Sequence, residues 1–128
     1  MPAEMVVKQP CGPEAAVTRS VTPELWPRIF VVCLKRWRTY FVGGMPVSDK
    51  VCTHIDFETL LPMEAGRVYH LRGVVEHQGA SAGDGHYVAY VRACDNRWYH
   101  CNDSVSPRVV SFSEVRAAEA YVLVYELA

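Results

Sequence analysis

The chain has 128 residues, enough for one domain with its own core, and half of them are hydrophobic, which argues against a disordered protein. Its 13 basic and 14 acidic residues give a formal net charge of −1, so bulk electrostatics offer no basis for binding nucleic acid or a membrane surface. Five cysteines without a CxxC pair indicate reduced thiols, as in a cytoplasmic or nuclear protein, rather than a disulfide framework.

Residues 1–26 differ from the rest of the chain, because prolines interrupt every long element there. A short helix within residues 14–19 is compatible with this composition, since Pro13 would occupy its first position. We expect residues 1–26 to form a weakly structured leader and residues 27–128 to form the folded domain.

Residues 28–37 begin with an apolar run and then become basic and aromatic. Their length and β-branched content predict a buried strand, with Lys35 and Arg36 at a solvated end. The apolar run is far too short to span a bilayer. Residues 38–50 contain two adjacent glycines and a proline and are expected to form a loop, followed by an edge strand or extended segment over residues 51–61.

The central stretch predicts three consecutive antiparallel strands. Residues 68–77 alternate between apolar and polar, residues 78–85 hold three glycines and no large apolar residue, and residues 86–94 alternate again. An Asp-Asn turn then leads into residues 97–103. Two-residue periodicity bounded by Gly, Asp and Asn is typical of strands joined by short connections.

Alternation within these strands also predicts which side chains share a face. One face of the first strand is expected to carry Tyr69, Leu71 and Val75. One face of the third strand is expected to carry Trp98, His100 and Asn102. If the third strand is regular, only one of Asn102 and Asp103 can face His86, which lies at the mouth of the glycine-rich loop.

The C-terminal part predicts an edge strand, a short helix and a closing strand. Residues 106–110 include a proline that cannot donate to a ladder, which suits a sheet edge. Ser111 and Glu114 fit a capping box, and the helix it opens is expected to end near Glu119. Residues 120–127 alternate strictly and predict the closing strand. The predicted fold class is α+β, mainly antiparallel β.

A histidine after a glycine-rich loop, with Asn or Asp one strand later, suits the base half of a Cys-His-Asn/Asp system. An imidazole titrates near neutrality, so it can take a thiol proton and later hand it to a leaving amine. A side-chain oxygen must accept the other ring N–H, because that contact fixes the tautomer and the ring plane. His86 with Asn102 or Asp103 meets these requirements.

No cofactor and no metal site are predicted. Cys94, His100 and Cys101 are close in sequence but lack paired ligand spacing and lie on alternating faces. His77 and His100 are expected to be strand surface residues rather than ligands.

Four ordered segments resemble the C-terminal half of the catalytic domain of ubiquitin-specific proteases (USPs). They are the Leu-Lys-Arg-aromatic strand at residues 34–37, the His-x-Gly … Gly-His-Tyr stretch at residues 77–87, the Trp-Tyr … Asn-Asp stretch at residues 98–103, and the Tyr-x-Leu-x-Tyr strand at residues 121–125. The resemblance implies that this chain is the β-rich C-terminal part of a papain-like cysteine protease fold.

The same resemblance implies roles for individual residues. His86 matches the general base, Asn102 the third member of the triad, and Asp103 an acidic neighbour that assists. The glycine-rich loop resembles the loop that lies over the ubiquitin tail, where glycines admit a Gly-Gly terminus and reject bulkier ends. The residues expected to contact substrate are Gly79, Gly83, Gly85, Tyr87 and Trp98, the two aromatics as core or cleft-wall side chains.

The chain departs from the family in its nucleophile. USPs carry the catalytic cysteine in a Gly-x-Thr-Cys box at the start of a helix, and no segment here matches that box. Cys11 precedes His86 in the right order but lacks the box residues. The paired CxxC zinc ligands that often build the family's ubiquitin-gripping fingers are also absent from this sequence.

These features predict the C-terminal part of a thiol-dependent deubiquitinase that hydrolyses ubiquitin (iso)peptide bonds, with no recognisable nucleophile of its own. The expected partners are ubiquitin or ubiquitinated proteins and a missing N-terminal half, with neither nucleic acid nor membrane. One alternative is a catalytically inactive module that binds ubiquitin or another partner. Another is an unrelated small β-rich domain in which the motif matches arise by chance.

Overall fold

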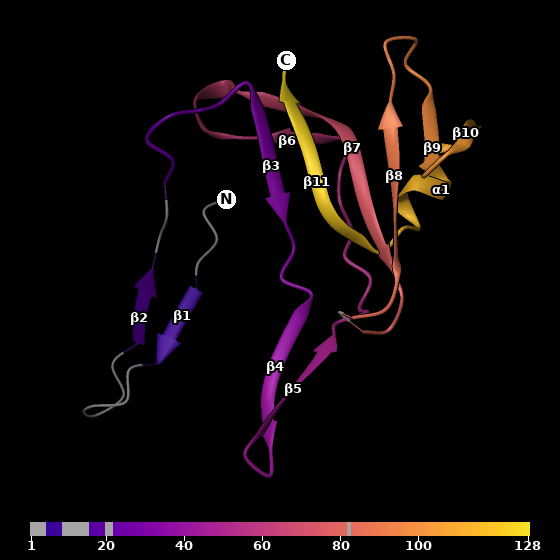
Figure 1. Cartoon of the computed structure of the whole chain (residues 1–128). Coiled ribbons are helices and arrows are strands. Elements are labelled where there is room, and N and C mark those ends of the chain that lie inside the picture. The colour runs from indigo at the N-terminus through magenta and orange to yellow at the C-terminus, as the bar shows by residue number, and fades with distance from the viewer. Residues whose placement is uncertain (1–4, 9–15, 20–21, 82) are drawn as a thin grey trace.

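The computed structural model describes residues 5–8, 16–19, 22–81 and 83–128. A seven-stranded antiparallel sheet forms its centre, with strand order β10-β9-β8-β7-β11-β3 and with β6 paired to β7 beside this path (Figure 1). Its strands in chain order are β3 (Ile29–Cys33), β6 (Leu60–Pro62), β7 (Val68–Gln78), β8 (His86–Arg92), β9 (Trp98–Asn102), β10 (Val105–Val110) and β11 (Ala120–Leu127).

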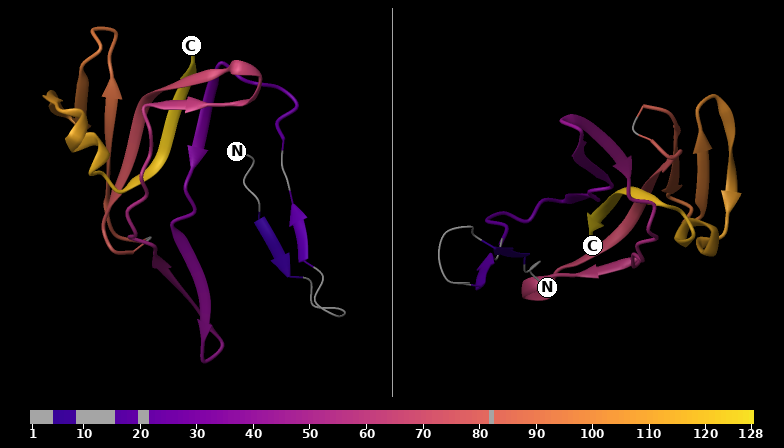
Figure 2. Two further views of the ribbon diagram at one scale, coloured as in Figure 1. Left: turned by 180° about the vertical axis from the view of Figure 1, so that it is seen from behind. Right: turned by 90° about the horizontal axis from the view of Figure 1, so that it is seen from below.

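Four further strands of the described residues form two separate pairs. These pairs are β1 (Met5–Lys8) with β2 (Ala16–Arg19), and β4 (Trp37–Val42) with β5 (Met45–Lys50). The β4–β5 hairpin projects away from the central sheet (Figures 1 and 2). The helical elements of the same described part are the 3-10 turn η1 (Glu64–Gly66) and the short α1 (Phe112–Arg116), and no helix there is long or apolar enough to cross a membrane.

The fold class and the three central strands are confirmed. The sheet is antiparallel, and β7, β8, β9 and β10 are neighbours in chain order, as expected for strands joined by short connections. The closing strand β11 then crosses to the other side of β7 and lies between β7 and β3. This places β7 and β11 at the centre, where the core side chains Tyr69, Leu71, Val74, Leu123 and Tyr125 are buried.

The expected face of β7 is wrong beyond Leu71, where Val74 rather than Val75 is fully buried. The β7–β11 register moves from Leu71↔Tyr125 to Gly73↔Val124, so that Arg72 is an extra residue on β7. A bulge of this kind reverses the side-chain alternation, because two residues of one strand oppose one of its partner. A prediction from strict alternation could not include this bulge, because the bulge is defined by the pairing of β7 with β11.

The predictions for residues 28–61 need three corrections. Among the described strands, β3 lies at the edge of the sheet with β11 as its one partner, and Val31 is 57% exposed, so β3 is not a buried strand. The expected loop over residues 38–50 is instead the β4–β5 hairpin, with Gly43 and Gly44 at φ values of 56° and 80°. Two residues with positive φ make the tight turn that suits the twist of a hairpin. Within residues 51–61, only the last two belong to a strand, β6.

The expected helix within residues 14–19 is also corrected, since residues 16–19 form β2, while Pro13 and residues 14–15 lie outside the described residues. Most of the predictions for the C-terminal part are confirmed. The edge strand β10 and the closing strand β11 are confirmed. Ser111 caps α1 by accepting a hydrogen bond from the Glu114 N–H at 3.3 Å, but the helix ends at Arg116, before Glu119.

Candidate functional site

The site is built where β8 begins and β9 ends. His86 is the first residue of β8, and Asn102 is the last residue of β9. The register pairs Ala89 with Cys101, so Asn102 lies beside Val88 and on the sheet face that also carries His86. Diagonal neighbours on one face are within reach of long side chains. The face of the third strand that was predicted to carry Asn102 is therefore the face on which His86 lies in the neighbouring strand.

The His86 ring meets the Asn102 side chain directly. His86 Nε2 lies 2.5 Å from Asn102 Oδ1. A carboxamide oxygen can only accept, so the ring must donate through an Nε2–H. In the neutral ring this leaves Nδ1 as the nitrogen with a free lone pair. The contact therefore selects the tautomer in which Nδ1 can take a proton.

Asp103 lies near the same ring nitrogen but does not contact it. Its Oδ2 is 3.8 Å from His86 Nε2, and its side chain is 75% exposed. The strand ends at Asn102, and Asp103 has a φ of 44°, a left-handed conformation that Asp and Asn tolerate better than most residues. This turn brings both side chains toward one ring nitrogen, which a regular strand would not allow.

The glycine-rich loop closes on itself at its base. A Cβ at Gly79 would lie 2.7 Å from the Asp84 carbonyl oxygen and 2.9 Å from Gly85 Cα, and the φ values of Gly79 and Gly85 are 139° and 150°. A Cβ at Gly85 would lie 2.5 Å from His77 Nε2. Side chains are thus excluded at both ends of the loop. At Gly83 an added Cβ would meet nothing within 4 Å.

His77 is buried rather than at the strand surface, which corrects the prediction. It is 2% exposed and packs edge-on between Trp37 and Tyr87, with ring centroids 5.1 and 4.8 Å away. Its Nδ1 is buried without a partner among the described residues. Tyr87 is 52% exposed, so its ring supports His77 while part of its side chain faces solvent.

Trp98 lies apart from this site. It is 7% exposed and packs against Phe112 of α1, with ring centroids 5.8 Å apart. It pairs with Arg92, at the other end of the seven-residue strand β8 from His86. That separation is about 20 Å along the strand. Trp98 therefore belongs to the core and is not among the proposed substrate contacts.

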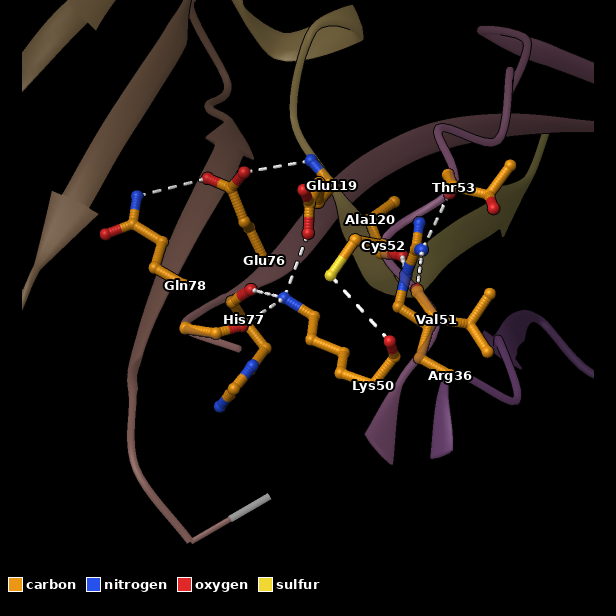
Figure 3. Close-up of polar contacts among 11 residues, drawn as sticks. Arg36, Lys50, Val51, Cys52, Thr53, Glu76, His77, Gln78, Glu119 and Ala120 are labelled. Atoms are coloured by element: carbon orange, nitrogen blue, oxygen red, sulfur yellow. Dashed lines mark hydrogen bonds and ion pairs between the residues drawn. The ribbon is translucent and has the colours of Figure 1, made fainter. Parts of the chain in front are cut away.

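Two buried cations, Arg36 and Lys50, were missed by the sequence patterns (Figure 3). Arg36 is 2% exposed, not solvated, and donates to the carbonyl oxygens of Ala120, Val51 and Thr53 at 2.5–2.8 Å. Lys50 is 8% exposed and lies against the base of the glycine-rich loop. Their acceptors come from distant parts of the chain, so no local pattern signals them.

The described residues contain no group of three or more His, Cys, Asp or Glu side chains that could hold a metal ion. They include four free thiols, those of Cys33, Cys52, Cys94 and Cys101. Cys11 lies outside the described residues.

Comparison with known proteins finds a family model and several proteins that are similar to this chain. The family model described as ubiquitin carboxyl-terminal hydrolase matches residues 11–125. Ubiquitin carboxyl-terminal hydrolase 44 of Ailuropoda melanoleuca is 34% identical over 113 residues, covering 77% of this chain and 15% of the relative. Ubiquitin carboxyl-terminal hydrolase 2 of Gallus gallus is 33% identical over 130 residues, covering 92% of this chain and 34% of the relative.

The fold is shared with solved structures. A chain of the yeast SAGA DUBm structure superposes with a TM-score of 0.70 at 27% identity, covering 90% of this chain and 27% of that one. The chain described here therefore spans about a third or less of each of these proteins. The match confirms the resemblance to part of a USP-type catalytic domain.

Proposed function

Because the chain belongs to the ubiquitin carboxyl-terminal hydrolase family, whose members are cysteine-type ubiquitinyl hydrolases, we propose that it supplies the acid–base part of a deubiquitinating site. The single observation that carries the proposal is the contact between His86 Nε2 and Asn102 Oδ1 at 2.5 Å. It orients an imidazole at the mouth of a glycine-rich loop and leaves Nδ1 free to act as a base.

In the proposed reaction His86 works through Nδ1. The ring takes the proton of a cysteine thiol, and the thiolate attacks the carbonyl carbon of the ubiquitin C-terminal (iso)peptide bond. His86 then gives this proton to the departing lysine amine, and an acyl-enzyme thioester remains. In the second half, His86 takes a proton from water, whose oxygen attacks the thioester, and returns it to the thiolate as ubiquitin leaves with a free carboxylate.

Asn102 and Asp103 have different parts in this proposal. Asn102 holds the ring plane and the tautomer through its direct hydrogen bond. Asp103, 3.8 Å from the same nitrogen and largely exposed, supports the imidazolium electrostatically when the ring is protonated. An exposed carboxylate at this distance contributes less than a direct hydrogen bond, because water screens it.

The substrate contacts proposed are the glycine-rich loop and the exposed side of Tyr87. Gly79 and Gly85 keep the loop base free of side chains, and at Gly83 the chain has open space around it. A loop of this kind can lie over an extended Gly-Gly tail without steric clash. We propose ubiquitin or ubiquitinated proteins as the partners and, from the free thiols, a cytoplasmic or nuclear location.

The nucleophile is proposed to come from outside these 128 residues, either from a further segment that carries the family's Gly-x-Thr-Cys box or from a partner that does. The 128-residue chain alone is therefore expected to show negligible hydrolysis of a fluorogenic ubiquitin C-terminal amide. Robust turnover that Cys11→Ala abolishes would contradict this part of the proposal.

A chimera tests the acid–base role. In Gallus gallus ubiquitin carboxyl-terminal hydrolase 2, the segment that matches this chain is replaced by the matching residues of this chain, so that the relative supplies the cysteine. The chimera is expected to hydrolyse the fluorogenic substrate, and His86→Ala should lower kcat by at least about 10²-fold, the usual contribution of general acid–base catalysis. His54→Ala, which changes a histidine with a half-exposed side chain, is the matched control and should leave kcat unchanged.

A binding module remains the second candidate, and the exposed apolar side chains of the β4–β5 hairpin favour it. Phe41 is 72% exposed and Met45 68% exposed, close to the turn of the hairpin. Titration of isotope-labelled ubiquitin with the 128-residue chain distinguishes the two functions. Chemical-shift changes in ubiquitin, together with a chimera that shows no turnover, would favour binding. No chemical-shift change up to millimolar concentration would exclude the binding function.

A further inference from the structure

Within the part of the chain that the structure describes, the last residues of β7 have no strand on one of their two edges. Pairing with β11 stops at Glu76, where it meets Ala120. Pairing with β8 continues two residues further, to Gln78, whose partner is His86. The backbone that positions His86 is therefore held by a strand on the β8 side only.

Lys50 supplies the hydrogen bonds that the missing strand would have made (Figure 3). Its Nζ donates to the carbonyl oxygen of His77 at 2.5 Å and to that of Gly79 at 3.1 Å. Both carbonyls bond the same Nζ, so they face the same side, whereas the Gln78 carbonyl oxygen between them lies 2.6 Å from an ideal Cβ at Gly85, on the β8 side. Lys50 thus clamps the two residues that flank the ladder partner of His86.

The Lys50 clamp, which consists of Lys50 and the carbonyl oxygens of His77 and Gly79, is buried, and the carboxylate of Glu119 balances its charge. The Lys50 side chain is 1% exposed, and its third contact is an ion pair with Glu119 Oε2 at 2.9 Å. An ammonium has three donors, and all three are used. The Glu119 N–H donates in turn to Glu76 Oε1 at 2.8 Å. The end of β5, the end of β7 and the start of β11 are therefore joined in one network.

The neighbouring cation of the same hairpin has no such role. Arg38 pairs with Asp49 across β4 and β5 at 2.9 Å, and its side chain is 68% exposed. Its hydrogen bonds within the described residues stay inside the hairpin, whereas Lys50 reaches residues 27 and 29 positions further along the chain. Burial and distant acceptors thus distinguish Lys50 from an ordinary strand-surface cation.

We propose that Lys50 is a positioning residue for His86, an inference that rests on the proposed acid–base role of that histidine. Lys50 holds the His77 and Gly79 carbonyls, which sets the Gln78–His86 pairing and the base of the glycine-rich loop. Release of this edge lets the start of β8 shift, and the short His86–Asn102 contact then loses its geometry. Within the described part of the chain, the Lys50 Nζ bonds two backbone carbonyls and Glu119, and none of its hydrogen bonds reaches the His86 ring. Lys50 is therefore proposed to act through the backbone.

Nuclear magnetic resonance of the 128-residue chain with ¹⁵N-labelled histidine tests the proposal at a pH where His86 is neutral. In the wild type the long-range ¹H–¹⁵N pattern of His86 is expected to be that of the Nε2–H tautomer. In Lys50→Met, a neutral side chain of similar length, His86 should show a mixture of tautomers. The Gln78 and His86 amides should exchange about tenfold faster, as expected for the loss of a charge-assisted hydrogen bond.

Arg38→Met is the matched control, and its spectrum should keep the wild-type His86 pattern. A folded Lys50→Met chain with the Nε2–H tautomer and the wild-type exchange rates would overturn the proposal. If Lys50→Met does not fold, Lys50→Gln, which keeps one or two donors, is measured in the same way. This variant must show a smaller change of the His86 pattern in the same direction. An unchanged His86 pattern would again overturn the proposal. A wild-type His86 without a predominant Nε2–H tautomer would instead refute the acid–base function itself, and this inference with it.

Discussion

At the scale of single residues, the site depends on which atom faces the imidazole. Asn102 makes the direct contact with His86, and Asp103 stands farther away and more exposed. A neutral carboxamide can orient the ring as well as a carboxylate in thiol systems, because the cysteine and histidine can form an ion pair between themselves. In the proposed mechanism the charge of Asp103 therefore supports the ring, and the direct contact with Asn102 orients it.

The first prediction separates these two residues in the chimera that carries a relative's cysteine. Asn102→Ala removes the acceptor of the Nε2–H, so kcat is expected to fall by about 10²-fold, within the range of general acid–base effects. Asp103→Ala should have a smaller effect on kcat, and the loss should shrink further at high salt, because the Asp103 contribution is electrostatic. Steady-state kinetics at two ionic strengths provide the measurement. A larger loss for Asp103→Ala at both would assign the orienting role to Asp103.

The second prediction concerns alkaline stability. Burial raises the pKa of the Tyr125 phenol above its ordinary value near 10, with the nearby Glu58 acting in the same direction. The unfolded chain therefore loses this proton at a lower pH than the folded chain, so the folded state binds more protons above pH of about 10 and stability falls as the pH rises. Urea unfolding between pH 8 and 11 should show this decline, with a shallower slope in Tyr125→Phe.

Tyr125→Phe also loses the hydrogen bond from the phenol to the Glu58 carbonyl oxygen, so its stability at pH 8 is expected to be lower. The quantity to compare between wild type and variant is the slope of the free energy of unfolding against pH above about pH 10, not its value at pH 8. Parallel slopes in wild type and variant would show that Tyr125 does not carry the alkaline decline.

At the scale of elements, the end of β7, the glycine-rich loop and the start of β8 form one unit. The loop needs glycine at its two ends, where added Cβ atoms would meet backbone or the His77 ring, but not at Gly83. Backbone closure at the loop base therefore brings the first residue of β8 to its place opposite Gln78. The β7–β11 bulge beside Arg72 is a second local feature that decides which β7 side chains enter the core.

The third prediction follows from the loop base. Gly85→Ala puts a Cβ 2.5 Å from His77 Nε2 at a φ of 150°, so it is expected to destabilise the chain by about 1–3 kcal/mol, as strained backbone does. Gly83→Ala is the matched control in the same loop, with no atom within 4 Å of its Cβ, and its effect should be under about 0.5 kcal/mol. Urea unfolding monitored by tryptophan fluorescence compares them. Equal effects would contradict the crowding at the loop base.

At the scale of the whole molecule, the sheet ends in the edge strand β3 with apolar side chains in solvent. Ile29 is 47% exposed and Val31 57% exposed, and the β4–β5 hairpin that follows is apolar as well. Exposed apolar edges are places where further chain or a partner can pair. This agrees with the fraction of each relative that the chain covers, such as 34% of the Gallus gallus protein.

The fourth prediction concerns this edge. The 128-residue chain is expected to self-associate with rising concentration, and Val31→Lys should weaken that association because a charge on an edge strand opposes pairing. Val91→Lys is the control, since Val91 is 43% exposed but lies on β8, which has strands on both sides. Sedimentation equilibrium measures the association constants. An association that Val31→Lys leaves unchanged would place the contact elsewhere.

The sequence by itself determined the local features: the alternating strands β7, β8, β9 and β11, the Ser111 cap, and the order of motifs that identified the family. These depend on residues a few positions apart, where periodicity and turn chemistry are informative. It also brought forward His86 with Asn102 or Asp103 as its partner. Alternation left the choice between these two residues open, and only the family resemblance favoured Asn102.

Only the tertiary structure decided which polar side chains are buried and which strand is an edge. Arg36 bonds the Ala120 carbonyl 84 residues away, and Lys50 pairs with Glu119, 69 residues away. A cation enters the interior only where the fold gathers enough acceptors to replace water, and those acceptors have no local sequence signal. For the same reason the burial of His77, the exposure of β3 and the shift of the β7 face could be known only once distant strands were paired.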